Sequence, residues 1–295
     1  MVAVASPRGG LWSAAKGSGL VRLCIGLGTI ALVLFVALFA PLIAPQPPDL
    51  IDFMSIASPP STEHLLGTDE AGRDILSRIF YGARVSVAVV FVSVFTAMLF
   101  GVSLGLVSGY RGGWVDDIIM RVIDIVISFP TLVLALLIIA LLGPGLQNAI
   151  VAISIVYIPY FARLTRGEVL SLKSRDYVSA ALSTGTPHRV ILFKEILPNL
   201  LGNIVVYASL AASEALITES ALSFLGLGVQ PPTPSWGYMI AAGMQYSSYW
   251  WISLFPGLAI FVTVIGFNFL GDTLRDAFDP TLARRTRSSG SGKEG

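Results

Sequence analysis

Residues 85–107 read VSVAVVFVSVFTAMLFGVSLGLV, and no charged residue lies between Arg84 and Arg111. A transmembrane helix needs about 20 apolar residues, because each residue rises about 1.5 Å and the hydrocarbon core is about 30 Å thick. The stretch therefore predicts a membrane-spanning helix. The composition agrees, since 54% of the 295 residues are hydrophobic and 13% are charged, whereas a soluble domain carries about 25% charged residues.

Five further stretches are long and apolar enough to span a bilayer, at 23–44, 118–142, 147–166, 200–224 and 249–271. The first of them is longer than the roughly 7–15-residue core of a secretory signal, so we expect it to be retained. The predicted fold class is an all-α integral membrane protein with six transmembrane helices. Pro130 and Pro159 fall within spans and predict kinks.

The basic residues predict the orientation of these spans. Six spans place both termini on the same side, and sixteen of the 19 Lys and Arg residues fall on that side. Only Arg73, Arg78 and Arg84 lie on the other side, and 225–248 contains none. Because cytoplasmic loops are enriched in Lys and Arg, both termini are predicted to be cytoplasmic.

The spans and their orientation divide the chain into parts. These are a cytoplasmic N-terminal segment 1–22, the first transmembrane helix 23–44, an external segment 45–84, a five-helix core 85–272 and a cytoplasmic tail 273–295. The core contains a cytoplasmic loop, 167–199, and an external loop, 225–248. Pro231, Pro232 and Pro234 should prevent regular helix in the external loop. An aromatic belt at the external interface is predicted for Trp236, Tyr238, Tyr246, Tyr249, Trp250 and Trp251.

The cytoplasmic loop contains a polar, patterned stretch between apolar spans, RDYVSAALSTGTPHRVILFKEILPN at 175–199. We expect a first amphipathic helix from about 172 to 183. It should end at Gly185, because glycine readily adopts the left-handed conformation found after helix C-termini. Thr186 should cap a second helix, and Pro187 should lie in its first turn, where no N–H is needed.

The second helix should carry an apolar stripe of Val190, Phe193 and Leu197 and should end at Pro198. The helical pair could lie on the lipid headgroups, but such helices favour Lys and Arg on their polar face. Here the polar faces are mixed in charge and small in side chain. A short rigid pair of this kind suits insertion into a groove of a partner protein, which is the interpretation we favour.

The same loop resembles a known motif. Ala180-Ala181, followed after three residues by Gly185 and later by Leu197-Pro198, is similar to the EAA loop of ABC importer permeases. In that family the loop is the coupling helix that docks on the cytoplasmic ATPase. Ser179 stands where glutamate is usual, so coupling here should depend on shape more than on one ion pair. The residues that the resemblance implicates are Asp176, Ser179, Ala180, Ala181, Gly185, Pro187, Leu197 and Pro198.

Three further stretches resemble the C-type permease of dipeptide and oligopeptide ABC importers, a binding-protein-dependent transport permease. They are HLLGTD at 64–69 with GRD at 72–74, ESALSFLGLGVQPPTPSWG at 219–237 and NFLGDTLRDAFDP at 268–280. The first supplies an external signature of Gly67, Thr68, Asp69, Gly72, Arg73 and Asp74. All three occur in the family's order, so the resemblance covers nearly the whole chain.

The resemblance implies the type I ABC importer permease fold and a transport subunit that is not an enzyme. A second permease would form a heterodimer with this chain, and one or two kinds of cytoplasmic ABC ATPase would bind ATP and Mg²⁺. An external substrate-binding protein would deliver the peptide substrate, and this chain would bind no cofactor. Nickel and glutathione importers share the signatures and stay open as alternatives.

A different class, the ion-coupled secondary transporter, would need ion-coupling residues at the membrane midplane and often an inverted repeat. Only Glu214 is a candidate for such a residue, and no repeat is visible. The net charge of +1 gives no reason to expect nucleic acid as a partner. We therefore favour the ATP-driven importer.

Two glutamates of the fifth span, Glu214 and Glu219, are candidates for the translocation pathway or a gate, because ionisable residues inside a membrane are commonly functional. Five residues apart, they point about 140° from each other on a helix and should not form one site. We place Glu219 near the external interface, where water lowers the cost of its charge. A structural role, hydrogen-bonded to a neighbouring helix, is the alternative for both. His64 with Glu63 and Asp69 is too loosely spaced for a metal site, and a solvated loop is expected there.

Overall fold

The computed structural model describes residues 18–246 and 248–278, which are helical apart from their connections and one isolated bridge between Thr68 and Asp74. The predicted terminal segments therefore fall outside the described residues over 1–17 and 279–295. The helices are α2 Ser18–Ile43, α3 Ile75–Arg111, α4 Gly113–Ile127, α5 Thr131–Leu142, α6 Leu146–Lys173, α7 Asp176–Ser183, α8 His188–Val190, the π-helix η1 Ile191–Ile196, α9 Leu197–Phe224, α10 Trp236–Met244 and α11 Trp251–Phe278. The all-α fold class is confirmed for the described part of the chain.

Five of the helical segments are long and apolar enough to cross a membrane. They are α2, α3, α6, the continuous stretch His188–Phe224 and α11. The segment predicted as one span at 118–142 is instead a bent pair, with α4 and α5 at 91° to each other. The break lies before Pro130, which lacks an N–H and disfavours helix at the residue before it. The pair makes a sixth span only if both helices together count as one.

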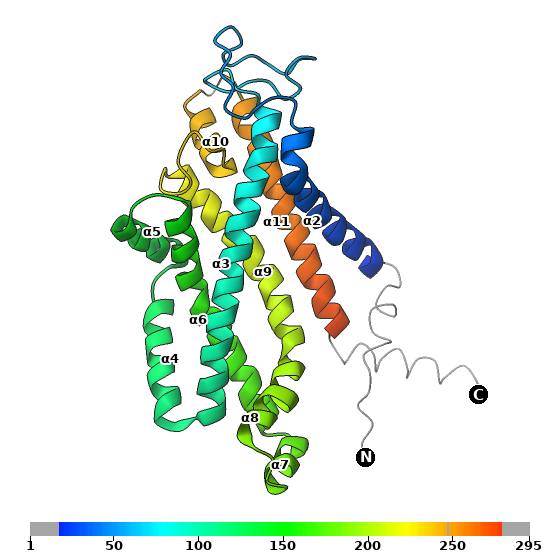
Figure 1. The fold of residues 1–295 in the computed structure, drawn as a ribbon, viewed down its shortest axis with the longest axis vertical. Coiled ribbons are helices and arrows are strands. Elements are labelled where there is room, and N and C mark those ends of the chain that lie inside the picture. The colour runs from blue at the N-terminus through cyan, green and yellow to red at the C-terminus, as the bar shows by residue number, and fades with distance from the viewer. Residues whose placement is uncertain (1–17, 247, 279–295) are drawn as a thin grey trace, which may run out of the picture.

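The helices α3, α6 and α9 form the centre of the molecule, with α2 and α11 against one flank and α4 and α5 on the other (Figure 1). Glycines spaced by four residues allow α3 and α6 to approach closely. A Cβ at Gly101 would lie 2.5 Å from Phe161 Cβ, and one at Gly109 would lie 2.9 Å from Val169 Cβ. Small residues at such positions favour helix packing inside membranes, where there is no hydrophobic driving force between helices.

Two ion pairs fasten α4 to α6. Arg166 donates from Nε and Nη2 to the two carboxylate oxygens of Asp116, at 2.6 Å each. Arg163 donates to Asp124 at 2.6 Å. Since α4 and α5 lie on the flank of the bundle, these contacts fix where the bent pair sits against α6.

Two helices begin within segments that were predicted to be external. The helix α3 begins at Ile75, ten residues before the predicted span, because Asp74 caps it by accepting a hydrogen bond from Ser77 N at 2.8 Å. The predicted external segment 45–84 is therefore non-helical only as far as residue 74. The predicted external loop 225–248 is non-helical over 225–235, where its prolines lie, but α10 follows directly and the prediction was wrong there. The side chain of Ser235 caps α10.

We call the lower end of the molecule in Figure 1, which carries α7 and α8, the α7 end. The opposite end carries α10 and the loop that connects α2 to α3, and we call it the α10 end. The predicted functional residues fall at these two ends and along α9 between them.

Candidate coupling and translocation sites

At the α7 end, the helix α7 stands apart from α6. The predicted first helix included Leu172, but this residue is buried within α6, which continues to Lys173. The helix α7 begins at Asp176, and its one fully buried side chain is Val178. Asp176, Ser179 and Ala180 are exposed. One apolar anchor thus holds α7 to the molecule while its outer face stays open.

Gly185 ends α7 as predicted. Its φ is +75°, its N–H donates to Leu182 O at 3.1 Å, and Thr186 N donates to Ala181 O at 3.1 Å. These two bonds are the pattern of the Schellman motif, which satisfies the last carbonyl groups of a helix. A Cβ at Gly185 would meet nothing within 4 Å, so the backbone conformation and not crowding requires glycine here. The turn after α7 therefore has a fixed shape.

The predicted cap of the second helix is wrong. The residue that precedes α8 is Pro187, no side chain caps the helix, and Thr186 lies outside it. Pro187 is exposed, as are Gly185 and Pro198. Gly185 and Pro187 of the turn are therefore accessible, as is the outer face of α7.

The predicted apolar stripe of the second helix is wrong at Phe193, whereas Val190 and Leu197 are partly buried. The buried side chains are Ile191 and Ile196, whereas Phe193 is 58% exposed. The segment Ile191–Ile196 is a π-helix, in which hydrogen bonds join residues five apart, so residues 191 and 196 share one face. The prediction assumed an ordinary period of 3.6 residues. Pro198 does not end the helix, because the helical chain runs unbroken from His188 to Phe224.

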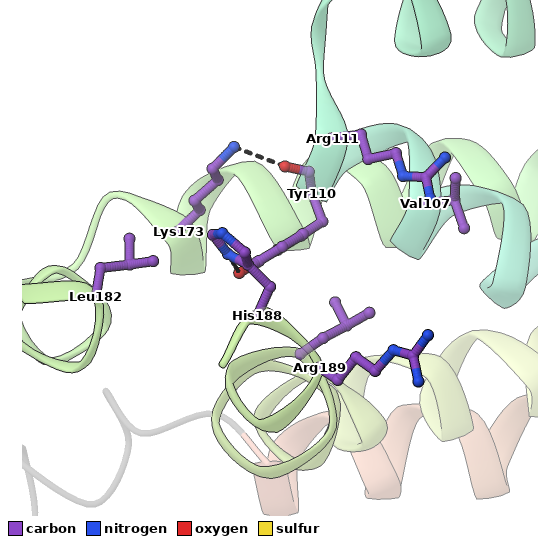
Figure 2. Close-up of a pocket in the computed structure, with 8 residues that line it drawn as sticks. Val107, Tyr110, Arg111, Lys173, Leu182, His188 and Arg189 are labelled. Carbon is purple, nitrogen blue, oxygen red and sulfur yellow. Dashed lines mark hydrogen bonds between the residues drawn. The ribbon is translucent and has the colours of Figure 1, made fainter. Parts of the chain in front are cut away.

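A cavity of about 610 Å³ separates the α7–α8 hairpin from the ends of α3 and α6 (Figure 2). Within its lining, the Tyr110 hydroxyl and His188 Nδ1 lie 2.7 Å apart, and Lys173 Nζ donates to Tyr110 O at 2.7 Å. The first contact braces the hairpin against α3, and the second joins the end of α6 to α3. The sequence did not single out Tyr110, because its partners are 63 and 78 residues away.

The two glutamates of α9 point in different directions, as predicted. Glu219 is fully buried between α9 and α3, where Ser223 Oγ donates to it at 2.8 Å and Ser86 Oγ at 3.4 Å. Its predicted position near water is therefore wrong, and the alternative structural role fits it. Glu214 lies instead on an open face and lines a cavity of about 510 Å³. The other lining residues are Thr131, Leu132, Tyr157, Tyr160, Tyr207, Ile217 and Thr218.

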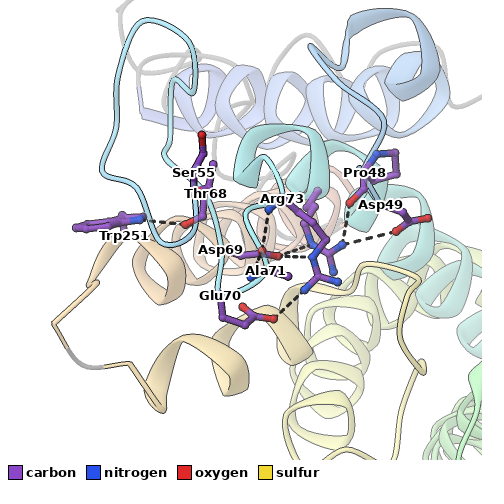
Figure 3. A network of polar contacts seen from close by, with 10 residues as sticks. Pro48, Asp49, Ser55, Thr68, Asp69, Glu70, Ala71, Arg73 and Trp251 are labelled. Atoms are coloured by element: carbon purple, nitrogen blue, oxygen red, sulfur yellow. Dashed lines mark hydrogen bonds and ion pairs between the residues drawn. The ribbon is translucent and has the colours of Figure 1, made fainter. Parts of the chain in front are cut away.

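At the α10 end, Asp69 and Arg73 of the external signature belong to a polar cluster (Figure 3). The cluster also encloses a buried arginine, Arg78. The Arg78 side chain is 1% exposed, donates to Pro48 O at 2.9 Å and lies 3.3 Å from the Asp69 carboxylate. Arg73 donates to Asp69 at 2.7 Å and to Glu70 at 2.8 Å. The cluster therefore links the α2–α3 loop to the first turns of α3.

Two glycines of the signature are required by the shape of this loop. Gly67 and Gly72 have φ values of +80° and +77°. A Cβ at Gly72 would overlap the carbonyl oxygen of Asp52, and one at Gly67 would lie 2.7 Å from Ser58 O.

Hydrogen bonds from the Ser55 hydroxyl and from Met54 N lower the pKa of the Asp52 carboxyl. The loop is thus a folded element with specific turns.

Two tryptophans that were predicted to belong to an interfacial belt are part of this packing. Trp236 is 2% exposed and donates to Ile79 O at 3.0 Å, and Trp251 is 7% exposed and donates to Thr68 O at 3.3 Å. Tyr246, Tyr249 and Trp250 are exposed, so the belt prediction stays open for them. Neither buried tryptophan is available as a membrane anchor.

His64, predicted to lie in a solvated loop, is buried, and its Nδ1 lies 3.1 Å from Asp74 Oδ1. It thus supports the residue that caps α3. Within residues 18–246 and 248–278, no group of three or more His, Cys, Asp or Glu side chains is arranged to hold a metal ion.

Comparison with known proteins gives a consistent result. Residues 101–284 match the family described as "Binding-protein-dependent transport system inner membrane component". The dipeptide transport system permease protein DppC of Escherichia coli (strain K12) is 47% identical over 265 residues, 88% of each chain. The glutathione transport system permease protein GsiD of Pectobacterium atrosepticum is 44% identical over 257 residues, 86% of this chain and 85% of that protein.

A solved structure shows the same fold. An inward-facing conformation of the MetNI methionine ABC transporter matches with a TM-score of 0.56 and 20% identity, covering 68% of this chain and 96% of that chain. At this identity, the match supports the fold alone.

Proposed function

Because this chain belongs to the family of binding-protein-dependent transport system inner membrane components, we propose that it imports peptides as one permease subunit of an ATP-driven transporter. The chain is a multi-pass membrane protein with the fold of ABC importer permeases. The observation that carries the proposal is its identity of 47% over 88% of a dipeptide permease. Glutathione import is the second candidate, because a glutathione permease is 44% identical over a similar length.

In the proposed topology, α4 and α5 together form one of six spans and both termini lie in the cytoplasm. The excess of Lys and Arg on one side of the spans supports this orientation. It places the α7 end in the cytoplasm and the α10 end outside. The Asp69–Arg78 cluster then lies on the side from which an external binding protein would deliver peptide.

The helix α7 and the turn after it are proposed to dock on a cytoplasmic ATPase and to act as a lever. The exposed residues Ser179, Ala180 and Gly185 leave room for a partner to approach closely. The helix that follows continues without a break into α9, so a displacement of the docked hairpin would reach the middle of the membrane along one rigid element. Val178 holds α7 to the bundle.

The remaining subunits are proposals of the same kind. A second permease would complete the pathway as a heterodimer, and one or two kinds of ABC ATPase would bind ATP and Mg²⁺. Glu214 is exposed and lines an open cavity, and we propose that the second permease covers this surface. This chain would contribute no catalytic residue.

The lever is tested by substituting Gly185. Gly185→Val should abolish ATP-driven uptake in proteoliposomes that hold the complete complex, while the chain still inserts in the membrane. The left-handed conformation costs an ordinary residue about 1–2 kcal/mol and is worse for a β-branched one, so the turn should change shape. Gly185→Asn is the matched control, because asparagine tolerates the left-handed conformation and should retain uptake.

Normal uptake and normal ATPase association in Gly185→Val would show that this turn is not the lever. Loss of uptake in both variants would instead show that any side chain at this site is excluded. Uptake that is equal with and without the ATPase subunits would contradict the proposed function itself.

A further inference from the structure

The cavity beside Glu214 combines one acidic and three aromatic side chains. Glu214 is ten residues from the end of α9 at Phe224, which corresponds to about 15 Å along the helix, half of a hydrocarbon core of about 30 Å. The aromatic residues are Tyr157 and Tyr160 on α6 and Tyr207 on α9. With the end of α9 placed at the external face of the hydrocarbon core, as in the proposed topology, the cavity lies at the depth of the bilayer centre.

A carboxylate at this depth is costly unless it faces water or a partner of opposite charge. The side chain of Glu214 is exposed in the isolated chain, whereas Glu219 is enclosed by hydrogen-bonding serines. Among the described residues that line the cavity, none is basic. Glu214 therefore faces either water or a positive group that comes from outside this cavity wall.

The three tyrosines are held in place around the open space. The Tyr157 hydroxyl lies 3.4 Å from Thr218 Oγ1, and the Tyr160 hydroxyl lies 3.3 Å from Thr131 Oγ1. The rings of Tyr157 and Tyr160 have centroids 6.1 Å apart, and Phe161 packs edge-to-face against Tyr207 at 4.9 Å. Residues of α5, α6 and α9 thus form the lining of one cavity, and a ligand can enter this cavity.

A carboxylate beside aromatic faces suits a small organic cation. An ammonium group has three N–H donors and no acceptor, and aromatic rings attract it through their negative faces. The relatives at 47% and 44% identity are named for dipeptide and glutathione transport. Dipeptides and glutathione differ in side chains and length, yet each carries a free primary ammonium group at one end.

From this geometry and chemistry, we propose that Glu214, with Tyr157, Tyr160 and Tyr207, binds the terminal ammonium group of the peptide as it crosses the membrane. The inference rests on the proposed function and adds the part of the substrate that is recognised. The site binds the terminal ammonium group that these peptides share and makes no specific contact with the rest of the substrate. It therefore suits a pathway whose selectivity is set elsewhere.

The test uses the complete complex in proteoliposomes with its binding protein and alanyl-alanine as substrate. Glu214→Gln keeps the shape and removes the charge, so uptake per ATP hydrolysed should fall by about tenfold. ATP hydrolysis stimulated by the binding protein should stay near the wild-type rate. Glu214→Asp should recover part of the uptake. Asp117→Asn, an exposed carboxylate on α4 that does not line the cavity, is the matched control and should behave as wild type.

A second measurement reports on the ammonium group directly. Saturation-transfer NMR on the complex without binding protein should show contact with alanyl-alanine and not with propionyl-alanine, which lacks the ammonium group. The difference should vanish in Glu214→Gln. Equal transfer to both compounds in the wild-type complex would overturn the proposal.

Two other outcomes would also overturn it. Unchanged uptake in Glu214→Gln would show that the carboxylate does not contact the substrate. A parallel loss of ATP hydrolysis, or loss of the second permease on purification, would assign Glu214 to an ion pair between the permeases. A wild-type complex that imports no peptide at all would instead refute the proposed function, so the two failures are distinguishable.

Discussion

The side chains of α7 divide between those that hold the helix and those that stay open. Val178 is fully buried and Ala181 is partly buried against the core, whereas Ala180 is exposed. The Tyr177 side chain is 37% exposed, and partial burial raises the pKa of its hydroxyl. The two neighbouring alanines of the EAA-like motif thus have different roles, one inside the molecule and one on the proposed docking face.

This difference predicts opposite effects for one substitution at two adjacent positions. Ala180→Phe should leave thermal stability unchanged and should abolish co-purification of the ATPase, because the added ring blocks the docking face. Ala181→Phe should instead lower stability by about 1–3 kcal/mol, the usual cost of overpacking. Thermal unfolding of the purified chain and co-purification of the ATPase measure the two effects. Retention of the ATPase by Ala180→Phe would contradict the docking face.

Several residue roles could not be predicted from the sequence, because they depend on partners far along the chain. Trp236 and Trp251 have the aromatic character of interfacial anchors, yet they donate hydrogen bonds to backbone oxygens 157 and 183 residues away. Glu219 accepts a hydrogen bond from Ser86, which lies 133 residues earlier in the chain. Gly185 was predictable, because its role follows from the local backbone alone.

Among the elements, the stretch from α8 to α9 determines how the α7 end is joined to the membrane. The π-helix Ile191–Ile196 places two isoleucines five residues apart on the buried face and leads into Leu197 without interruption. A π-helical turn arises from one extra residue within an α-helix and often marks a functional site. Here it sets the rotation of the α7–α8 hairpin relative to α9.

Adding one residue to the regular helix beyond the π-helical turn should rotate the hairpin. Insertion of one alanine after the exposed Asn199 lengthens the α-helix by one residue and turns everything before it by about 100° relative to the rest of α9. We expect normal membrane insertion and loss of uptake by about 100-fold or more, as for other misplacements of this size. Deletion of the exposed Lys194 is the control and should retain uptake, because Ile191 and Ile196 then lie four residues apart in an ordinary helix and still share one face. Uptake by the insertion variant at the wild-type rate would show that this rotation is not required.

The sequence predicted the existence and type of the long helices well and their ends less well. Apolar length identified five spans that the structure confirms as helices. This signal is strong because a helix must carry about 20 apolar residues to span the hydrocarbon core. The break between α4 and α5 exceeds the kink that Pro130 alone suggested, since ion pairs to α6 fix α4 independently of α5. The π-helix was missed because a hydrophobic pattern with a period of 3.6 cannot reveal an inserted residue.

At the scale of the whole molecule, the two ends differ in chemistry. The α10 end is a tightly paired network in which Arg78 is enclosed by Asp69 and backbone oxygen. The α7 end presents an exposed hairpin beside a cavity lined by Arg111, Lys173 and Arg189. The cavity lined by Glu214 lies between them. This asymmetry suits delivery at one end and ATPase coupling at the other.

The proposed orientation predicts which positions are reached from outside the cell. In a Cys24→Ser background, Ser61→Cys should react with a membrane-impermeant maleimide in right-side-out vesicles. Ser183→Cys should react only after the membrane is made permeable. Both positions are exposed, so accessibility depends on the side of the membrane. Labelling of Ser183→Cys in sealed right-side-out vesicles would show that the orientation is the reverse of the proposed one.

In the proposed function, this chain couples ATP hydrolysis by its partner ATPase subunits to the passage of peptide along its own helices. The most direct measurement is uptake of labelled alanyl-alanine by proteoliposomes that contain the complete complex, with ion gradients collapsed by ionophores. We predict accumulation that requires internal ATP and external binding protein. Uptake that follows an imposed ion gradient and proceeds without the ATPase subunits would contradict the account.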